Sequence, residues 1–379
     1  MTTTKYHHPS GSKKRIVFIL PALSGGGAER VLITLMNNLD PARHERIFIT
    51  INEDGPLRDL IAPGIPFHSF GPGVSVGRSM FRLYKKLKEL QPDIVMSTMA
   101  HMNFGVLLLK FFFPKTRFIV REAITPSYFS QRPWRVRFPI YMAYRFLYPY
   151  ADMVISPAQK IIDEFRDLLK IDIGNHQLLF NPVDTDHILD RSVNFPPVTQ
   201  DRNETVHFIC AGRLDPQKGY DRLIDSVAAL KMPCDWQLTI LGEGNQREEL
   251  EDRIEKSGLD KKIFLAGFVR TPWPLVAAAD AFLMPSRQEG MPNAILEALA
   301  CGTPVIATRS SGGVGEIACH APAGAVTIVD TMDEFVDTMS KIRPSPTVGF
   351  RPSLLPHAFS KDAVMERFTK LLAQQGELF

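Results

Sequence analysis

The residues most suited to chemistry lie in the stretch R-Q-E-G-M-P-N-A-I-L-E-A-L-A-C-G-T-P-V-I-A-T, which covers residues 287–308. Pro292 suits an early helical position and Gly302 suits a helix end, so the sequence predicts a helix over residues 293–300. The N-terminus of such a helix presents free N–H groups to an anion, and Gly290 has no side chain to block that approach. The stretch therefore predicts an anion site, such as a phosphate site.

Two glutamates accompany this predicted helix N-terminus. Glu289 lies just outside the helix, and Glu297 lies about one and a half turns inside it. The other residues of the helix are apolar, and a lone carboxylate there is costly to bury unless it accepts hydrogen bonds. Sugar hydroxyls are suitable donors. The two carboxylates therefore predict a polyol site beside the phosphate site rather than a solvated helix face.

Two cations stand in a loop that follows a predicted strand, in A-G-R-L-D-P-Q-K-G-Y at residues 211–220. Arg213 and Lys218 in this loop can together neutralise a diphosphate. Taken alone, either residue also fits a solvated surface charge.

A glycine loop, S-G-G-G-A-E-R, follows the first predicted strand. Gly25, Gly26 and Gly27 let backbone amides approach an anion at the start of the next helix. The spacing is not G-x-G-x-x-G, and the following strand ends in Asn52 rather than in an acid, so the loop does not match a dinucleotide site. A tight turn without a ligand is the alternative interpretation.

Strand-like apolar runs alternate with helical patterns along the chain. In the first half we expect strands at 15–20, 46–52, 93–98, 117–121 and 152–156, and helices near 78–90, 103–112 and 158–169. The alternation begins again at residue 206 with the strand V-H-F-I-C-A-G-R, and we expect further strands in W-Q-L-T-I-L-G-E-G, K-I-F-L-A-G-F-V, A-F-L-M-P-S and P-V-I-A-T. It predicts parallel sheets covered on both faces, with ligands at the carboxyl ends of the strands. A length of 379 residues allows two such α/β domains.

Taken together, these motifs resemble retaining glycosyltransferases of family 4. The resemblance is carried by E-G-M-P-N-A-I-L-E with the following C-G-T-P-V-I-A-T, by A-G-R-L-D-P-Q-K-G-Y, by L-G-E-G, by S-G-G-G-A-E-R and by N-P-V-D at residues 181–184. It implies the GT-B fold, in which two Rossmann-like doubly wound domains face a central cleft.

The resemblance also implies a domain order. A flexible N-terminus over residues 1–14 would precede an N-terminal acceptor-binding domain over residues 15–190. A linker over residues 191–204 would lead to a C-terminal nucleotide-sugar-binding domain over residues 205–356. A helix within residues 357–379 would pack back on the first domain.

For the second half, the resemblance implies a role for each matching residue. Arg213 and Lys218 would bind the donor diphosphate and stabilise the departing nucleotide. Glu289 would contact the donor sugar, Glu297 would hold the ribose, and Arg270 lies where family members bind the base. Backbone contacts to sugar and phosphate would come from Gly290, Met291, Pro292 and Asn293.

For the first half, the implied roles concern the glycine loop and two single residues. The loop from Gly25 to Gly27 would face the diphosphate or the acceptor. His101, in S-T-M-A-H-M-N-F, is the best match to a histidine that contacts the transferred sugar, with an ordinary structural histidine as the alternative. Glu122, in I-V-R-E-A, is a candidate acceptor contact, although Ala123 stands where related enzymes often have a histidine.

The implied reaction moves a hexose or N-acetylhexosamine from a nucleotide-sugar to a lipid-linked or polysaccharide acceptor, with retention of configuration. A UDP-sugar is the favoured donor and GDP-mannose the alternative. No metal and no cofactor are expected, because two cations and a helix N-terminus can stabilise the leaving diphosphate. Front-face substitution and double displacement both stay open. A glycosidase does not fit, because Glu297 suits ribose. An epimerase or hydrolase of the same fold and a non-catalytic glycan-binding protein are the alternatives.

The charge is unevenly distributed. Residues 76–150 hold 13 Lys or Arg and three acidic residues, a local charge of 13 − 3 = +10 against +3 for the whole chain. The basic aromatic segment at residues 110–150 predicts docking on an anionic membrane surface, and hence a cytoplasmic protein held peripherally at the inner face of the plasma membrane. Ordinary core aromatics with solvated arginines are the alternative. Nucleic-acid binding would leave the second-half motifs unexplained and is not expected.

The cysteines and the N-terminus agree with a cytoplasmic protein. The four cysteines have no C-x-x-C spacing, so neither a disulfide framework nor a zinc site is predicted. The first 14 residues lack the apolar centre of a signal peptide.

Overall fold

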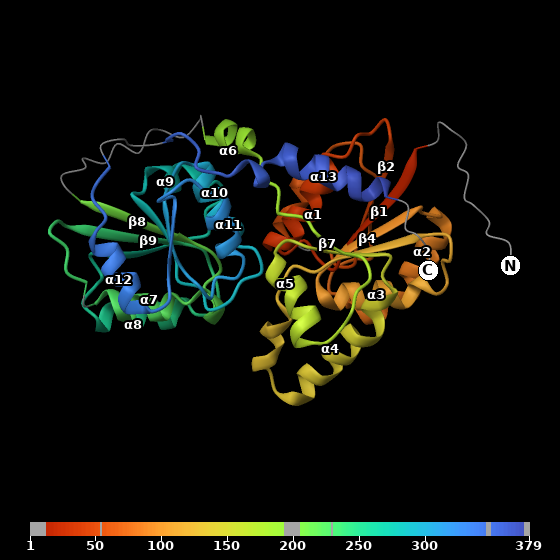
Figure 1. Cartoon of the computed structure of the whole chain (residues 1–379), viewed down its shortest axis with the longest axis horizontal. Coiled ribbons are helices and arrows are strands. Elements are labelled where there is room, and N and C mark those ends of the chain that lie inside the picture. The colour runs from red at the N-terminus through yellow and green to blue at the C-terminus, as the bar shows by residue number, and fades with distance from the viewer. Residues whose placement is uncertain (1–12, 54, 193–204, 229, 346–349, 375–379) are drawn as a thin grey trace. The chain divides into compact units, whose positions relative to one another are not determined.

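A computed structural model describes residues 13–53, 55–192, 205–228, 230–345 and 350–374 (Figure 1). Its contacts divide the chain into two compact units. The first comprises Met1–Ser156, Ile161–Leu179 and Met365–Phe379, and the second comprises Pro157–Lys160 and Phe180–Val364. Most of the predicted flexible N-terminus, residues 193–204 of the predicted linker and the end of the predicted C-terminal helix lie outside the described residues.

The first unit is built on a parallel sheet. Among the described residues, seven strands pair in the order β3-β2-β1-β4-β5-β6-β7. Their central members are continuous runs of β-branched and aromatic residues that are buried on both faces, as parallel sheets require. The strands are β1 (Lys14–Leu20), β2 (His44–Thr50), β3 (Phe67–Ser69), β4 (Ile94–Thr98), β5 (Arg117–Arg121), β6 (Met153–Ser156) and β7 (His176–Leu178).

Helices cover both faces of this sheet. One layer contains α2, α3 and α4, which pack side by side in that order, and the other contains α1 (Figure 1). The helices are α1 (Gly27–Asn37), α2 (Val76–Leu90), α3 (Ala100–Lys110), α4 (Trp134–Leu147) and α5 (Gln159–Asp163), with a π-helical turn over Glu164–Leu168 and short 3-10 turns at Pro56–Leu60, Pro126–Gln131 and Tyr148–Tyr150.

The C-terminal helix α13 (Lys361–Ala373) belongs to both units, since the division falls between Val364 and Met365. Its later part completes the first unit. Arg117 Nη1 donates to the Leu372 carbonyl at 3.0 Å, and Arg367 Nε donates to the Leu178 carbonyl at 2.8 Å. The residues of this helix that bury their side chains are Val364, Phe368, Leu371 and Leu372.

The second unit repeats the architecture. Six strands within the described residues pair in parallel in the order β10-β9-β8-β11-β12-β13. The strands are β8 (Val206–Ala211), β9 (Trp236–Leu241), β10 (Ile263–Gly267), β11 (Ala281–Met284), β12 (Val305–Thr308) and β13 (Val326–Val329). The helices are α6 (Thr185–Ser192), α7 (Tyr220–Val227), α8 (Arg247–Lys256), α9 (Trp273–Ala278), α10 (Asn293–Ala300), α11 (Val314–His320) and α12 (Met332–Ser340), with 3-10 turns at Pro216–Lys218 and His357–Phe359.

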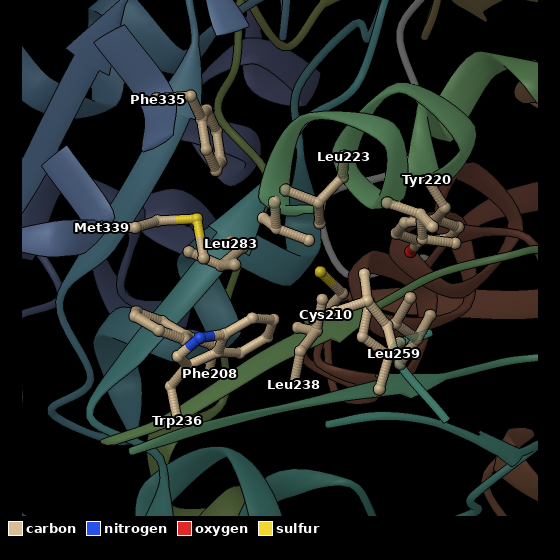
Figure 2. Packing of buried hydrophobic residues seen from close by; sticks show 14 of the residues in the cluster. Phe208, Cys210, Tyr220, Leu223, Trp236, Leu238, Leu259, Leu283, Phe335 and Met339 are labelled. Carbon is tan, nitrogen blue, oxygen red and sulfur yellow. The ribbon is translucent and has the colours of Figure 1, made fainter. Parts of the chain in front are cut away.

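A hydrophobic core of the second unit lies between the sheet and the layer formed by α7, α8 and α12. Figure 2 shows Phe208 and Trp236 from β8 and β9 packed with Leu283 from β11 and with Phe335 and Met339 from α12. Burying side chains of this size contributes about 1.5–3 kcal/mol each. This core makes the sheet a rigid base for the loops at its edge.

The predicted fold class, two Rossmann-like doubly wound domains, is confirmed. Within the described ranges, no helix is long and apolar enough to span a bilayer.

Candidate active site

In each unit, most residues predicted for chemistry lie where the strand order reverses. In the second unit this point falls between β8 and β11, and in the first unit it falls between β1 and β4. Ligands of α/β sheets bind outside the carboxyl ends of the strands at this position. The topology thus brings Arg213 and Lys218, which follow β8, close to Glu289, which follows β11.

The centre of the second unit's site is an ion pair. Lys218 Nζ lies 2.8 Å from Glu289 Oε1, and the same oxygen accepts a hydrogen bond from Ser286 Oγ at 2.9 Å. The pair is largely shielded, with 16% of the Lys218 side chain and 11% of the Glu289 side chain exposed. Two donors on one oxygen fix the orientation of the carboxylate. Ser286, which the sequence analysis missed, is itself fully buried.

Arg213 contrasts with this shielded pair. Its side chain is 74% exposed, and its Nη2 lies 3.2 Å from Asp215 Oδ2. The L-G-E-G turn packs against the loop that carries Arg213. An added Cβ at Gly242 would lie 1.9 Å from the Gly212 carbonyl oxygen, so only glycine lets the two backbones approach. The structure therefore offers one exposed and one shielded cation within a single short loop.

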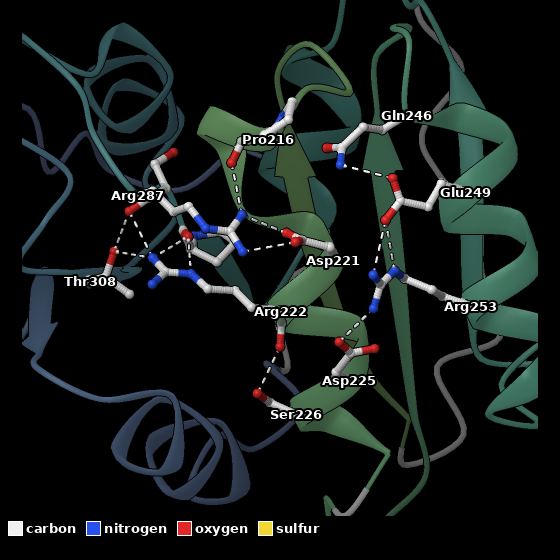
Figure 3. Close-up of polar contacts among 12 residues, drawn as sticks. Pro216, Asp221, Arg222, Asp225, Ser226, Gln246, Glu249, Arg253, Arg287 and Thr308 are labelled. Carbon is white, nitrogen blue, oxygen red and sulfur yellow. Dashed lines mark hydrogen bonds and ion pairs between the residues drawn. The ribbon is translucent and has the colours of Figure 1, made fainter. Parts of the chain in front are cut away.

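The loops that carry the ion pair are tied together by arginines (Figure 3). Arg222 donates from Nε and Nη2 to the Pro285 carbonyl at 2.9 and 2.6 Å, and from Nη2 to the Ser286 carbonyl at 2.9 Å. Arg287 forms a bidentate pair with Asp221 at 2.7 and 2.8 Å. These contacts hold the segment before Glu289 against the start of α7. No sequence motif predicts these contacts, because the partners are far apart in the chain.

The N-terminus of α10 completes this part of the site. The helix covers the predicted residues 293–300, with Pro292 as its N-cap, and it has no acidic residue in its first turn. The preceding backbone is held by the Gly313 amide, which donates to the Gly290 carbonyl at 2.7 Å. Met291 is buried. The Asn293 side chain accepts a hydrogen bond from Asn181 Nδ2 of the N-P-V-D motif at 2.5 Å.

Glu297, on the same helix, has a protein donor. Trp273 Nε1 donates to Glu297 Oε2 at 2.9 Å. The indole thus supplies a hydrogen bond of the kind that the sequence analysis assigned to sugar hydroxyls, and the site retains further acceptor capacity because a carboxylate has about four lone-pair positions. Arg270 is exposed in the turn between β10 and α9.

In the first unit, the glycine loop begins α1. Gly25 has a φ of 93°, a left-handed conformation that favours glycine. Gly26 is the N-cap, and its amide donates to Glu29 Oε2 at 2.6 Å, which is the half of a capping box that a glycine N-cap can form. One of the backbone N–H groups that were predicted to meet an anion, that of Gly26, therefore already donates to the Glu29 carboxylate.

His101 lies in the first turn of α3, directly after β4. Met99, the N-cap of that helix, has a φ of 76°, which is strained for a residue other than glycine. Although the His101 residue is exposed, desolvation by the surrounding protein lowers the pKa of its imidazole and so favours the neutral form. Its contact with a transferred sugar stays a prediction.

Glu122 does not lie where an acceptor would meet it, which differs from the expectation. It is 1% exposed, and its Oε2 accepts hydrogen bonds from Tyr148 Oη at 2.5 Å and Tyr144 Oη at 3.2 Å. Asn103 Nδ2 donates to the Tyr148 hydroxyl at 3.0 Å and extends this network. Desolvation raises the pKa of Glu122 to about 7. The carboxyl therefore holds α4 and the following turn to the end of β5.

One pair of acids, Asp184 and Asp186, has the D-x-D spacing of metal-dependent sugar transferases. Asp184 Oδ2 lies 2.9 Å from Lys361 Nζ, and Asp184 Oδ1 accepts from the His187 amide at 3.1 Å at the start of α6. These contacts give Asp184 a structural role. In the described part of the chain, no group of three or more His, Cys, Asp or Glu side chains is placed to hold a metal.

The chain matches two family models that together cover most of its length. "Glycosyltransferase Family 4" matches residues 25–187, and "Glycosyl transferases group 1" matches residues 194–347. The chain therefore belongs to the family 4-like glycosyltransferases and is a transferase with the GT-B fold. This result favours the transferase interpretation over an epimerase, a hydrolase or a non-catalytic glycan-binding protein.

Individual relatives agree with this assignment. The chain is 27% identical over 330 residues, 84% of its length, to the N-acetylgalactosamine-N,N'-diacetylbacillosaminyl-diphospho-undecaprenol 4-alpha-N-acetylgalactosaminyltransferase of Campylobacter jejuni, of which 87% is covered. Its fold is similar to Anabaena HepE in complex with UDP and glucose, with a TM-score of 0.71 and 19% identity over 95% of this chain and 99% of that one. It is also similar to the lipopolysaccharide outer core galactosyltransferase WaaB, with a TM-score of 0.67 and 20% identity over 94% and 99%.

Proposed function

We propose that this chain transfers a hexose or N-acetylhexosamine from a UDP-sugar to a lipid-linked glycan, with retention of configuration and without a metal ion. The observation that carries the proposal is the Lys218–Glu289 ion pair at the second unit's switch point, with the exposed Arg213 in the same loop as Lys218. The UDP complex of HepE supports the choice of nucleotide. The diphospho-undecaprenol substrate in the name of the Campylobacter jejuni relative supports a lipid-linked acceptor.

The reaction breaks the bond between the anomeric carbon and the diphosphate oxygen. Arg213, Lys218 and the N–H groups at the start of α10 would stabilise the charge that develops on this oxygen, which is the role a metal ion has in other transferases. The acceptor hydroxyl attacks the same face of the sugar, and its proton passes to the departing oxygen. Because Oε1 of Glu289 is already bound by Lys218 and Ser286, we assign Glu289 to holding the sugar rather than to nucleophilic attack.

A single set of assays tests donor, metal and stereochemistry. We expect UDP, with EDTA present, to raise the thermal stability of the protein, while GDP and ADP give smaller shifts. Saturation at about 100 times the dissociation constant adds about 2.7 kcal/mol. Transfer from an α-linked UDP-sugar to a polyprenyl-diphosphate glycan is then expected to continue in EDTA and to give an α-linked product by NMR.

Three results would contradict parts of this proposal. A larger thermal-stability shift with GDP than with UDP would indicate GDP as the donor nucleotide. Activity that is lost in EDTA and returns only with added Mg²⁺ or Mn²⁺ would show that the reaction needs a metal ion. Release of free sugar at the same rate with and without acceptor would indicate a hydrolase.

We further propose that the first unit docks on an anionic membrane at the inner face of the plasma membrane. Residues 132–139, R-P-W-R-V-R-F-P, are all exposed, and the large apolar side chains among them include Trp134 at 64% and Phe138 at 56%. Arg132, Arg135 and Arg137 stand between these side chains. Cations beside exposed aromatic side chains fit the interface between headgroups and acyl chains.

Charge reversal tests this docking. Each basic residue near an anionic surface contributes about 1 kcal/mol, so changing Arg132, Arg135 and Arg137 to Glu is expected to weaken binding to phosphatidylglycerol vesicles at least a hundredfold. Activity on a soluble acceptor analogue should stay unchanged. The matched control reverses three exposed lysines elsewhere, Lys256, Lys341 and Lys370. Equal loss of vesicle binding in both triple variants would rule out a specific docking surface.

A further inference from the structure

We propose that Trp273 is a positioning residue that orients the Glu297 carboxylate and thereby sets how well the site distinguishes a ribose with a 2′,3′-diol from one that lacks it. The inference rests on the proposed function, in which the donor nucleotide places its ribose on Glu297. Nothing in the sequence motifs marks Trp273 for this role, since it stands in the short T-P-W-P-L segment at the start of α9.

The contact that carries the inference is a single charge-assisted hydrogen bond. Trp273 is the first residue of α9, and its Nε1 donates to Glu297 Oε2 at 2.9 Å. An indole N–H has no acceptor function, so the direction of this bond is unambiguous. Hydrogen bonds to an ionised carboxylate are about twice as strong as neutral ones. The bond therefore holds the end of a flexible glutamate side chain in one orientation.

The indole itself is held in place. The ring of His187, from α6, contacts it edge-on, with a centroid distance of 5.6 Å and an interplanar angle of 81°. The neighbouring Pro274 is buried and fixes the start of α9. Trp273 and Glu297 both keep part of their surface exposed, so a ligand can reach the carboxylate that the indole orients.

The chemistry of a vicinal diol explains why this orientation matters. Two adjacent hydroxyls can donate to one carboxylate only when its oxygens lie in the right plane. An unrestrained glutamate loses rotamer freedom when it binds, and that entropy opposes binding. A carboxylate already fixed by the indole avoids most of this loss. The benefit applies only to ligands that carry the diol.

This dependence separates positioning from a purely structural role. If the Trp273 hydrogen bond to Glu297 only stabilised the fold, its loss would lower the affinity for every nucleotide equally. If it orients Glu297 toward ribose, its loss weakens UDP and leaves 2′,3′-dideoxyuridine diphosphate unaffected, because the two ligands have the same base and diphosphate.

The test measures the affinities of both nucleotides by calorimetry. Trp273→Phe keeps a ring against His187 but removes the N–H. We expect it to weaken UDP about tenfold, the loss of one hydrogen bond to a charged group, and to leave the dideoxy ligand within twofold. Glu297→Gln should show the same selective loss, and the double variant should be no worse than Glu297→Gln, because both changes remove one interaction. Trp273→His, which keeps a ring N–H, should recover part of the preference.

Trp236→Phe is the matched control, because it makes the same chemical change in the core of the same unit, where Trp236 is 3% exposed. It should lower stability without changing the ratio of the two affinities. If Trp273→Phe leaves the ratio of the affinities for UDP and for the dideoxy ligand unchanged, the inference is overturned while the proposed function stands. Wild-type protein that binds neither nucleotide overturns the proposed function, and the inference with it.

Discussion

Replacing Lys218 with methionine is expected to lower kcat/KM for the UDP-sugar by about a thousandfold. Methionine keeps the length of the side chain but removes the charge that meets both Glu289 and the leaving diphosphate. Two side chains donate to Oε1 of the shielded Glu289 carboxylate, and the substitution removes Lys218 while Ser286 stays. The free energy of unfolding should therefore fall by about 2 kcal/mol, the scale of one lost charged hydrogen bond.

Two further variants separate these effects. Adding Glu289→Gln to Lys218→Met removes the unpaired charge, so stability should largely return while kcat/KM stays low. Lys231→Met, at an exposed position of the same unit, should change neither quantity. If Lys218→Met keeps more than a tenth of the wild-type kcat/KM, Lys218 does not stabilise the leaving group. Steady-state kinetics and urea unfolding supply the measurements.

A second large effect is expected in the pH dependence of stability. Burial raises the pKa of Glu122 to about 7 from its ordinary value of 4.5. Between these values the folded protein binds the proton and the unfolded chain does not, so the free energy of unfolding falls as pH rises through this window. The full difference corresponds to about 3 kcal/mol. Glu122→Gln, which resembles the protonated carboxyl, should therefore gain stability over wild type above pH 7 and match it near pH 4.5.

The comparison between these two proteins isolates Glu122. The neighbouring Arg121, with a pKa of about 10, and Tyr144, with a pKa well above its ordinary value, do not change charge in this window. Tyr148→Phe removes a hydrogen bond that favours the ionised carboxylate, so it should move the window to higher pH. Urea unfolding at several pH values measures all three proteins. If the difference in free energy of unfolding between wild type and Glu122→Gln does not change with pH, Glu122 keeps an ordinary pKa.

Much of the fold is predictable because buried parallel strands are short apolar runs that end in turn residues. This signal identified β1, β4, β8 and β11, the strands that border the two switch points. The short strands β3, β7 and β13 were not predicted, since they are only partly buried and lack a continuous apolar run. The helix α4 was not predicted either. Only Tyr144 of its residues is buried and Pro139 lies inside it, so no apolar stripe marks it in the sequence.

The site shows the same limit. Motifs indicated Lys218 and Glu289, but their separation of 71 positions gave no sign that they form an ion pair. The supporting residues Ser286, Arg222 and Trp273 were missed because their partners are set by tertiary packing and no local motif surrounds them. Glu122 was predicted as an acceptor contact, but the two tyrosines that bury it lie 22 and 26 residues further along the chain. No local pattern indicates such a network.

The path of the chain through α13 has a consequence for the covalent integrity of the enzyme. A peptide bond broken anywhere between Ser192 and Thr205 divides the chain into two fragments, yet the second fragment still carries Met365–Ala373, which belongs to the first unit. Arg117 and the buried face of α13 would then hold the fragments together without a covalent link. The C-terminal helix thus makes the pair of fragments a complementing complex rather than two separable domains, and a protein produced as two such pieces has the means to reassemble.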